Sequence, residues 1–194
     1  MFLYLQLYPF SQTIGFKAGL NISNTKGLNA CPDDKAGWNA GAIVQFKINK
    51  RFYVQPELLY AGKGHRFHPP FASDSGAIRL NYVNMPILFC YKADDKLSIL
   101  LGPELGYLAN STVRYNKSVF DQTGRYPRVD VGIDLGFSYK INTSLGADLR
   151  FNYGFKDIQY TDYAGYTAPI KGGNRVFQAG LFYLLRKLHF PFLL

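Results

Sequence analysis

The residues of this chain that could do catalytic chemistry gather in one segment, residues 65–75. It contains His65 and His68, followed by Ser73, Asp74 and Ser75, the residue types of a hydrolytic centre. A serine becomes a nucleophile only where an oriented base lies within hydrogen-bond reach, and two histidines without a third ligand make a poor metal site. Such residues in a long connection are typical of a solvated loop. The sequence therefore predicts no catalytic residue, no metal site and no cofactor, and an enzyme with its site on this loop is the third of three interpretations.

The carboxylates and thiols elsewhere in the chain are also better explained by structural roles than by catalysis or metal binding. Asp130 and Asp134 are four residues apart, so in a strand they project to the same side. Ion pairs with Lys and Arg account for them better than acid–base catalysis does. Cys31 and Cys90 are far apart and have no neighbouring metal ligands, which excludes a zinc site.

The positive charge of the chain is spread rather than clustered. Lys and Arg number 22 against 13 Asp and Glu, a net charge of +9. Nucleic-acid binding needs a basic patch, whereas these cations are scattered, as at Lys17, Lys47 and Lys63, with no run of 5 or more like charges. We therefore expect no nucleic-acid partner.

The segments that position these side chains alternate apolar and polar residues with a period of two, which is typical of β-strands. In the seventh of them, Leu145, Ala147 and Leu149 alternate with Gly146 and Asp148. The same alternation predicts eight strands, at about residues 14–23, 37–47, 52–63, 78–91, 97–107, 129–139, 145–155 and 175–185. The strand at 78–91 is apolar on both faces, so its facing stays open, and Asn81 and Asn84 can both face outward only if a bulge lies between them.

The connections between these strands alternate in length. Residues 49–51, 92–96 and 141–143 are tight turns, whereas residues 24–35, 65–77, 109–124 and 157–174 are long and hold most of the Gly, Ser, Asn, Asp and Pro. An antiparallel up-and-down meander that closes on itself puts short turns at one rim and long loops at the other. The sequence therefore predicts an all-β, eight-stranded antiparallel up-and-down transmembrane β-barrel.

The facing of the barrel is inferred from what each side of the strands carries. The polar side is rich in Gly, Ser and Asn, as suits a narrow lumen, and its charges can pair there. This predicted lumen charge network is Lys17, Lys47, Glu57, Lys63, Glu104, Asp130, Asp134, Asp148 and Arg150. The apolar side carries two aromatic belts, as at the two surfaces of a bilayer. The belt toward the long loops is Trp38, Tyr60, Tyr107, Tyr126, Tyr153 and Phe177, and the belt toward the short turns is Phe46, Phe52, Phe89, Phe137 and Tyr139. The second interpretation, a soluble periplasmic lipocalin-like barrel carrying a small apolar ligand, reverses this facing.

The 194 residues are enough for one domain. No apolar run reaches the length of about 18 residues that a membrane-spanning helix needs. Residues 1–12 are apolar and end in small polar residues, like a clipped signal peptide without its basic part, or form an N-terminal extension. We therefore predict a barrel domain at 13–187 and a C-terminal tail at 188–194.

Five segments carry a family resemblance: FYVQPELLYAGKG at 52–64, YVNMPIL at 82–88, LGPELGY at 101–107, DVGIDLG at 130–136 and LRFNYG at 149–154. In this order they resemble the PorT-like outer-membrane β-barrel domain, over residues 13–185. Two features depart from the family pattern. Asn84 stands where the family usually has an acid, and residues 187–194 extend past the expected last strand.

The resemblance implies a barrel in the outer membrane of a Gram-negative bacterium. Most members of that family lack a defined activity, one branch is linked to protein secretion, and no catalytic residue is transferred. We therefore expect the lipid bilayer as one partner and, through the long loops, an extracellular ligand or a secretion-machinery protein as another. The expected role is structural, adhesive, recognition or secretion-accessory, without catalysis and with a plugged polar lumen.

Overall fold

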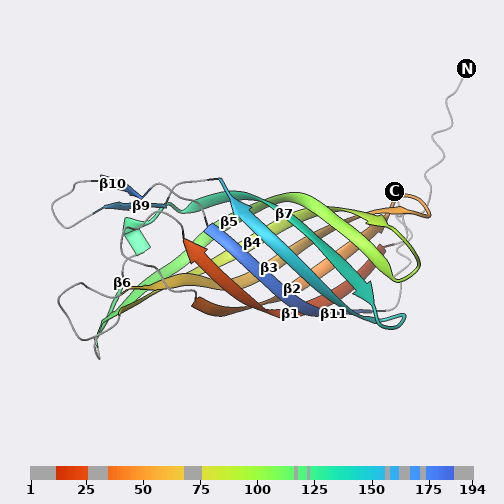
Figure 1. Cartoon of the computed structure of the whole chain (residues 1–194), viewed down its shortest axis with the longest axis horizontal. Coiled ribbons are helices and arrows are strands. Elements are labelled where there is room, and N and C mark those ends of the chain that lie inside the picture. Colours follow the sequence, from red (N-terminus) through yellow and green to blue (C-terminus); the bar gives the residue numbers. More distant parts are fainter. Residues whose placement is uncertain are drawn as a thin grey trace, which may run out of the picture.

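Eight long strands form a closed antiparallel barrel in the computed structural model (Figure 1). The structure describes residues 12–25, 35–67, 76–115, 118–121, 123–155, 158–161, 167–170 and 174–185. The strands of the ring are β1 (Gln12–Thr25), β2 (Lys35–Lys47), β3 (Phe52–Phe67), β4 (Gly76–Lys92), β5 (Leu97–Tyr115), β7 (Val129–Lys140), β8 (Leu145–Gly154) and β11 (Asn174–Leu184). Their order is β4-β3-β2-β1-β11-β8-β7-β5, and the pairing of β4 with β5 closes the ring. The predicted up-and-down barrel is confirmed.

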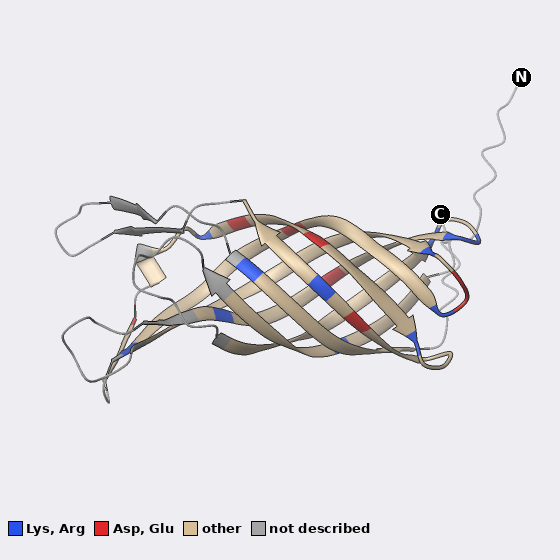
Figure 2. Cartoon of the chain, viewed as in Figure 1, with Lys and Arg blue, Asp and Glu red and all other residues tan. Residues whose placement is uncertain are grey.

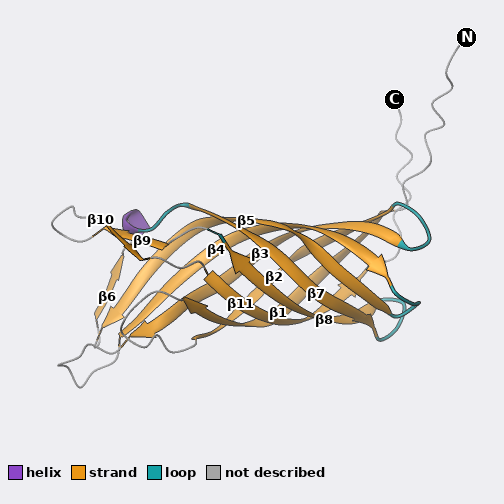
Figure 3. Cartoon of the chain, turned by 45° about the horizontal axis from the view of Figure 1, so that its top comes forward, coloured by secondary structure: helices purple, strands orange, loops and turns teal. Residues whose placement is uncertain are grey.

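Short elements lie at the end of the barrel with the long connections (Figure 3). They are β6 (Ser118–Asp121), which pairs with β5, the 3-10 turn η1 (Thr123–Arg125), and the hairpin of β9 (Ile158–Thr161) with β10 (Thr167–Ile170). No helix of the described residues is long and apolar enough to cross a membrane.

The three tight turns at the opposite end share one hydrogen-bond pattern, centred on Asn49, Asp94 and Asn142. In the first, the Oδ1 of Asn49 accepts hydrogen bonds from the backbone N–H groups two and three residues later, both at 2.8 Å. Asp94 does the same at 2.7 and 2.6 Å, and Asn142 at 2.9 and 2.7 Å. Such Asx turns satisfy backbone donors that the reversing chain would otherwise leave unpaired. The positions of these turns match those predicted from the sequence.

Alternate side chains of each strand point to opposite sides of the barrel wall. In β7, Ile133 and Leu135 are exposed on the outside, whereas Asp130 and Asp134 are buried inside. The outer wall is apolar along the other strands too, with Leu20, Leu101 and Leu149 among its exposed residues. This facing is the one predicted for contact with lipid, and it is the opposite of a lipocalin-like barrel.

The strand that is apolar on both faces, β4, turns one apolar set into the lumen. Leu80, Tyr82, Leu88 and Cys90 are buried there. Asn84 is also buried inside, whereas Asn81 lies on the outer side, and the register between β4 and β5 shifts between Asn81 and Tyr82. Positions 81 and 84 are three apart, so regular alternation already puts them on opposite sides of the wall, and the arrangement with both asparagines facing outward, which would need a bulge between them, does not occur.

Candidate functional site

The interior of the barrel contains an ion-pair network that joins opposite walls. Arg150 of β8 makes a two-pronged contact with Glu57 of β3, with Nη1–Oε2 at 2.8 Å and Nη2–Oε1 at 2.6 Å. In the ring order, β3 and β8 are four places apart among eight strands. This contact therefore spans the lumen from one wall to the other. Both side chains are almost wholly buried, and a two-pronged arginine–carboxylate pair is the strongest form of charged hydrogen bond.

The network continues to β1 and β2. Asp148 pairs with the Nζ of Lys17 and lies 2.6 Å from the Nε of Arg150. On the other side of Glu57, the Nε2 of Gln55 donates to Oε1 at 2.5 Å, and Gln45 donates to Gln55 at 2.7 Å. Cations and carboxylates alternate along this chain, so each buried charge has an opposite charge beside it, as burial in a narrow lumen demands. Figure 2 shows acidic and basic positions in the wall of the barrel along its length.

A second, more acidic group lies on β3, β5 and β7. Lys63 pairs with Glu104 at 3.1 Å and lies over the ring of Tyr82, 5.1 Å from its centroid. The Nδ2 of Asn152 donates to Asp134 at 2.8 Å. Asp130 is also buried. The structure thus brings eight of the nine charged residues of the predicted network into the lumen.

Lys47 is the predicted member that does not join them. It is exposed at the last position of β2, beside the turn, where its ammonium group reaches water. The alternation of β2 placed Lys47 on the inward side, but alternation does not show that the strand, and with it the barrel wall, ends at this residue. Among the described residues, the buried charges are therefore five carboxylates and three cations.

Apolar clusters fill the lumen on both sides of the charged residues. Toward the turns, Tyr53, Leu88, Cys90 and Leu100 form one cluster, and a second consists of Ile43, Phe182 and Leu184. Gly146 leaves the space for the ring of Phe182, because a Cβ on it would lie 2.2 Å from that ring. Toward the long loops, Leu80, Tyr82, Leu108 and Tyr126 form the third cluster.

Tyr126 was predicted to belong to the aromatic belt at the loop end, and that prediction is wrong. Its side chain is only 6% exposed and packs in the third apolar cluster. The residue lies in the connection before β7, where the two-residue period no longer sets the facing. The other five aromatics predicted for this belt are on the outside, and Trp38 and Tyr60 contact each other with ring centroids 5.7 Å apart.

The side chains from 65 to 75 lie outside the described residues, as does Cys31. Cys90 is a free, buried thiol. No group of three or more His, Cys, Asp or Glu in the described part of the chain is placed to hold a metal ion.

Comparisons with known proteins agree with this architecture. A family model described as outer membrane protein beta-barrel domain matches residues 10–160, and no curated protein sequence matches. Among solved structures, Ail, the attachment invasion locus protein of Yersinia pestis, is 11% identical, with a TM-score of 0.53 over 91% of this chain and 99% of Ail. Ail in complex with the heparin analogue sucrose octasulfate is also similar, at 12% identity and a TM-score of 0.51 over 90% of this chain and 99% of that one. Neisserial surface protein A is 14% identical, with a TM-score of 0.54 over 89% of this chain and 96% of that protein.

Proposed function

Because the chain belongs to the outer membrane protein β-barrel domain family, and so lies in the outer membrane of a Gram-negative bacterium, we propose that it is a non-conducting barrel with a plugged lumen. In this proposal the barrel acts through the surface at its long-loop end, by binding an extracellular ligand or a secretion-machinery protein, and without catalysis. The five segments that resemble PorT-like domains support a place near that branch of the family.

The contact between Arg150 and Glu57 carries the proposal of a plugged lumen. It crosses the lumen between opposite strands, and eight strands leave an interior that side chains can fill. Apolar clusters lie on either side of it, and an ion crossing them would leave water without finding a replacement ligand.

Single-channel recording in planar bilayers tests this proposal. We expect the purified barrel to show no large, steady conductance. Replacing Arg150 and Glu57 together by alanine removes the cross-lumen contact and should raise conductance, whereas Lys47→Gln, outside the network, should not. Large and steady currents from the unaltered chain would refute a plugged lumen.

The surface at the long-loop end has features that suit recognition. β5 extends past the last residue that pairs with β7 and forms a hairpin with β6, where Val119 and Phe120 are 63% and 50% exposed. Contiguous exposed apolar side chains mark contact sites, and these two are neighbours on one short strand beyond the β5–β7 pairing. Arg114 and Arg128 are also exposed there. Ail, a barrel of the same fold, is named as an attachment protein and has been solved in complex with a heparin analogue, which supports the proposal of a recognition role.

Site-specific photocrosslinking in living cells tests where the partner binds. A photoreactive residue at Val119, at the loop end, should form crosslinks to a partner. The same residue at Thr143, in a tight turn, is the matched control at the opposite end. Crosslinks from position 143 and none from 119 would show that the barrel acts from its periplasmic side.

The absence of catalysis is part of the same proposal. The ionisable residues of the lumen pair mainly with one another, which leaves them occupied in structural contacts rather than poised to react.

A further inference from the structure

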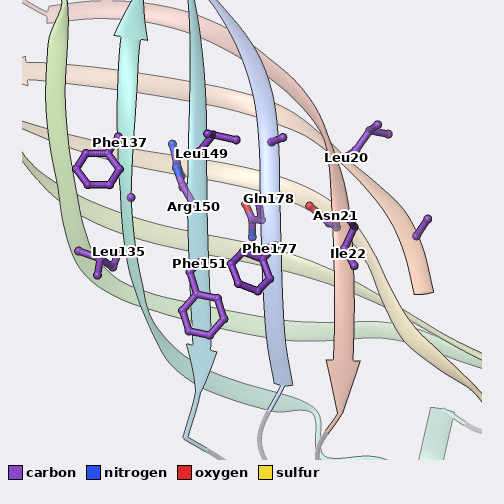
Figure 4. Close-up of a pocket in the computed structure, with 13 residues that line it drawn as sticks. Leu20, Asn21, Ile22, Leu135, Phe137, Leu149, Arg150, Phe151, Phe177 and Gln178 are labelled. Carbon is purple, nitrogen blue, oxygen red and sulfur yellow. The ribbon is translucent and has the colours of Figure 1, made fainter. Parts of the chain in front are cut away.

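The lipid-facing wall of the barrel is hollowed between two neighbouring rows of side chains. In the first row, each residue is the pairing partner of the next on the neighbouring strand, from β7 to β2: Phe137, Leu149, Ala179, Leu20 and Trp38. The second row is connected in the same way: Leu135, Phe151, Phe177, Ile22 and Ala36. The furrow between these rows has a volume of about 660 Å³ and an almost wholly apolar lining (Figure 4).

The floor of this furrow is the backbone between the two rows. Gly136, Arg150, Gln178 and Asn21 occupy these positions, and the last three turn their side chains into the lumen, where they are buried. The small side chains of Ala179 and Ala36 deepen the furrow. Its lining thus resembles a groove for a hydrocarbon chain.

A second hollow of about 380 Å³ continues the furrow across β2, β3 and β4, and Ala36 lines both. Its lining is polar and aromatic: Trp38, Tyr60, Gly62, Arg79 and Asn81 contribute to it. Gly62 pairs with Asn81 across the β3–β4 ladder. A Cβ on Gly62 would be in ordinary contact, 3.6 Å from the Oδ1 of Asn81 and 3.9 Å from the backbone oxygen of Trp38, so glycine leaves this hollow open.

Two polar groups of this hollow can meet a ligand. Arg79 is exposed, and no carboxylate of the described residues forms an ion pair with it. Asn81 donates its Nδ2 to Asn110 at 2.6 Å, while its Oδ1 lies beside Gly62 as an acceptor. Lys63 also lines the hollow, but its ammonium group pairs with Glu104 inside the lumen. The cation suits a phosphate and the acceptor suits a hydroxyl group.

The furrow climbs through the membrane because the strands of such barrels tilt by about 35–45°. Its first row begins at Phe137, near the turn end of β7, and reaches Trp38, near the loop end of β2. The polar hollow therefore lies at the loop-side surface of the bilayer. From Gly62 in the polar hollow to Ala179 in the furrow, the distance along the wall is three strand spacings, about 14 Å.

We propose that this furrow is a binding site for a phosphate-bearing lipid of the surrounding bilayer. Its acyl chain lies between the two apolar rows, its phosphate contacts Arg79, and a hydroxyl of its headgroup donates to Asn81. The occupant is a lipid rather than a second copy of the chain because an apolar groove complements an anionic amphiphile when the cation at its surface end pairs with none of the described carboxylates. This site depends on the membrane location of the barrel and is independent of whether the lumen conducts.

Trp38 reports on this site directly, because it is the single tryptophan of the chain. The folded full chain is placed in vesicles of phosphatidylcholine and phosphatidylglycerol, with bromine on the acyl chains of one lipid at a time to quench Trp38 fluorescence. We expect phosphatidylglycerol to be preferred at Trp38 by about five-fold, the effect of one arginine near an anionic headgroup. Equal quenching by the two lipids, or quenching by neither because a protein covers the furrow, would overturn the proposal.

Amino-acid substitutions test whether the preference for phosphatidylglycerol depends on the proposed lipid site. Arg79→Gln should abolish the preference, and Gly62→Leu should do the same by filling the polar hollow. Arg51→Gln is the matched control, since Arg51 is exposed at the turn end, and it should keep the preference. Heat-dependent mobility on gels verifies that each variant is folded. A preference that survives in folded Arg79→Gln would contradict the assigned headgroup contact.

Discussion

At the scale of single residues, the contact between Arg150 and Glu57 yields a quantitative prediction. Arg150→Met leaves the buried carboxylate of Glu57 without its cation, and breaking a buried pair in this way costs about 3–5 kcal/mol of unfolding free energy. Replacing both residues, as Arg150→Met with Glu57→Leu, should restore most of that loss because no lone charge stays behind. Urea unfolding in lipid vesicles measures these differences.

Lys47→Met is the control for that comparison, because Lys47 is a lumen-side position by alternation but is exposed at the rim. As a surface substitution it should change the unfolding free energy by about 0.5 kcal/mol or less. If Arg150→Met were no more destabilising than Lys47→Met, the cross-lumen pair would contribute nothing to stability.

The alternation of β7 and β8 predicts opposite responses at neighbouring positions. Ile133→Arg and Leu149→Arg put a cation on the outer wall and should cost about 2–4 kcal/mol near the middle of the bilayer. Asp134→Arg acts inside instead, by crowding the lumen and by removing the acceptor of Asn152. A lipid-soluble quencher should reach a probe at position 133 better than one at position 134, and the reverse order would invert the facing of this strand.

At the scale of elements, the three Asx turns differ in one property, which is that Asp94 can ionise. Hydrogen bonds from the backbone N–H groups of Leu97 and Lys96 hold the pKa of Asp94 below its usual value of 3.8. The stabilisation from this carboxylate is therefore complete above that usual value and disappears as the pH falls through the lowered pKa. Asp94→Asn should remove this acid-dependent part while keeping the turn.

The measurement is the unfolding free energy of each variant relative to the unaltered chain, from neutral to strongly acidic pH. Asp94→Ala should be less stable at neutral pH, because two backbone donors lose their acceptor, and this deficit should shrink in acid. Asn142→Ala removes the matching acceptors of another turn, and its deficit should stay constant with pH. A constant deficit in Asp94→Ala as well would mean that the carboxylate charge is irrelevant to the turn.

Some of these elements could be predicted from the sequence, and others could not. The strands and tight turns were predictable because alternation and turn residues are local signals. The inward face of β4 was not, since the lumen itself contains apolar clusters and both faces of that strand are apolar. Tyr126 was misplaced because it lies in a connection, and Lys47 because alternation does not mark where the wall ends.

Which charged residues pair with each other could not be predicted from the sequence either. That Arg150 meets Glu57 depends on ring closure, which puts β3 opposite β8. The lipid furrow likewise follows from register, because its rows join residues of five strands. Local patterns identify which side chains face inward or outward, whereas closure and register decide which of them meet.

At the scale of the whole molecule, we predict that the membrane separates the two cysteines. Cys90 is buried in the lumen cluster near the turn end, beside Tyr53, Leu88 and Leu100, and we predict Cys31 in the first long loop, outside the cell. A disulfide needs Cα atoms within about 7 Å, whereas a hydrocarbon core about 25 Å tall lies between these two ends. We therefore expect no disulfide bridge between Cys31 and Cys90.

An impermeant maleimide should label Cys31 on intact cells, while Cys90 should react only after unfolding, since its sulfur is packed among apolar side chains. Cys31→Ser is the control, which should abolish labelling of intact cells. A bridge between Cys31 and Cys90, detected by mass mapping of the folded, unreduced protein, would overturn the placement of the first loop at the far end of the barrel from the turn beside β4.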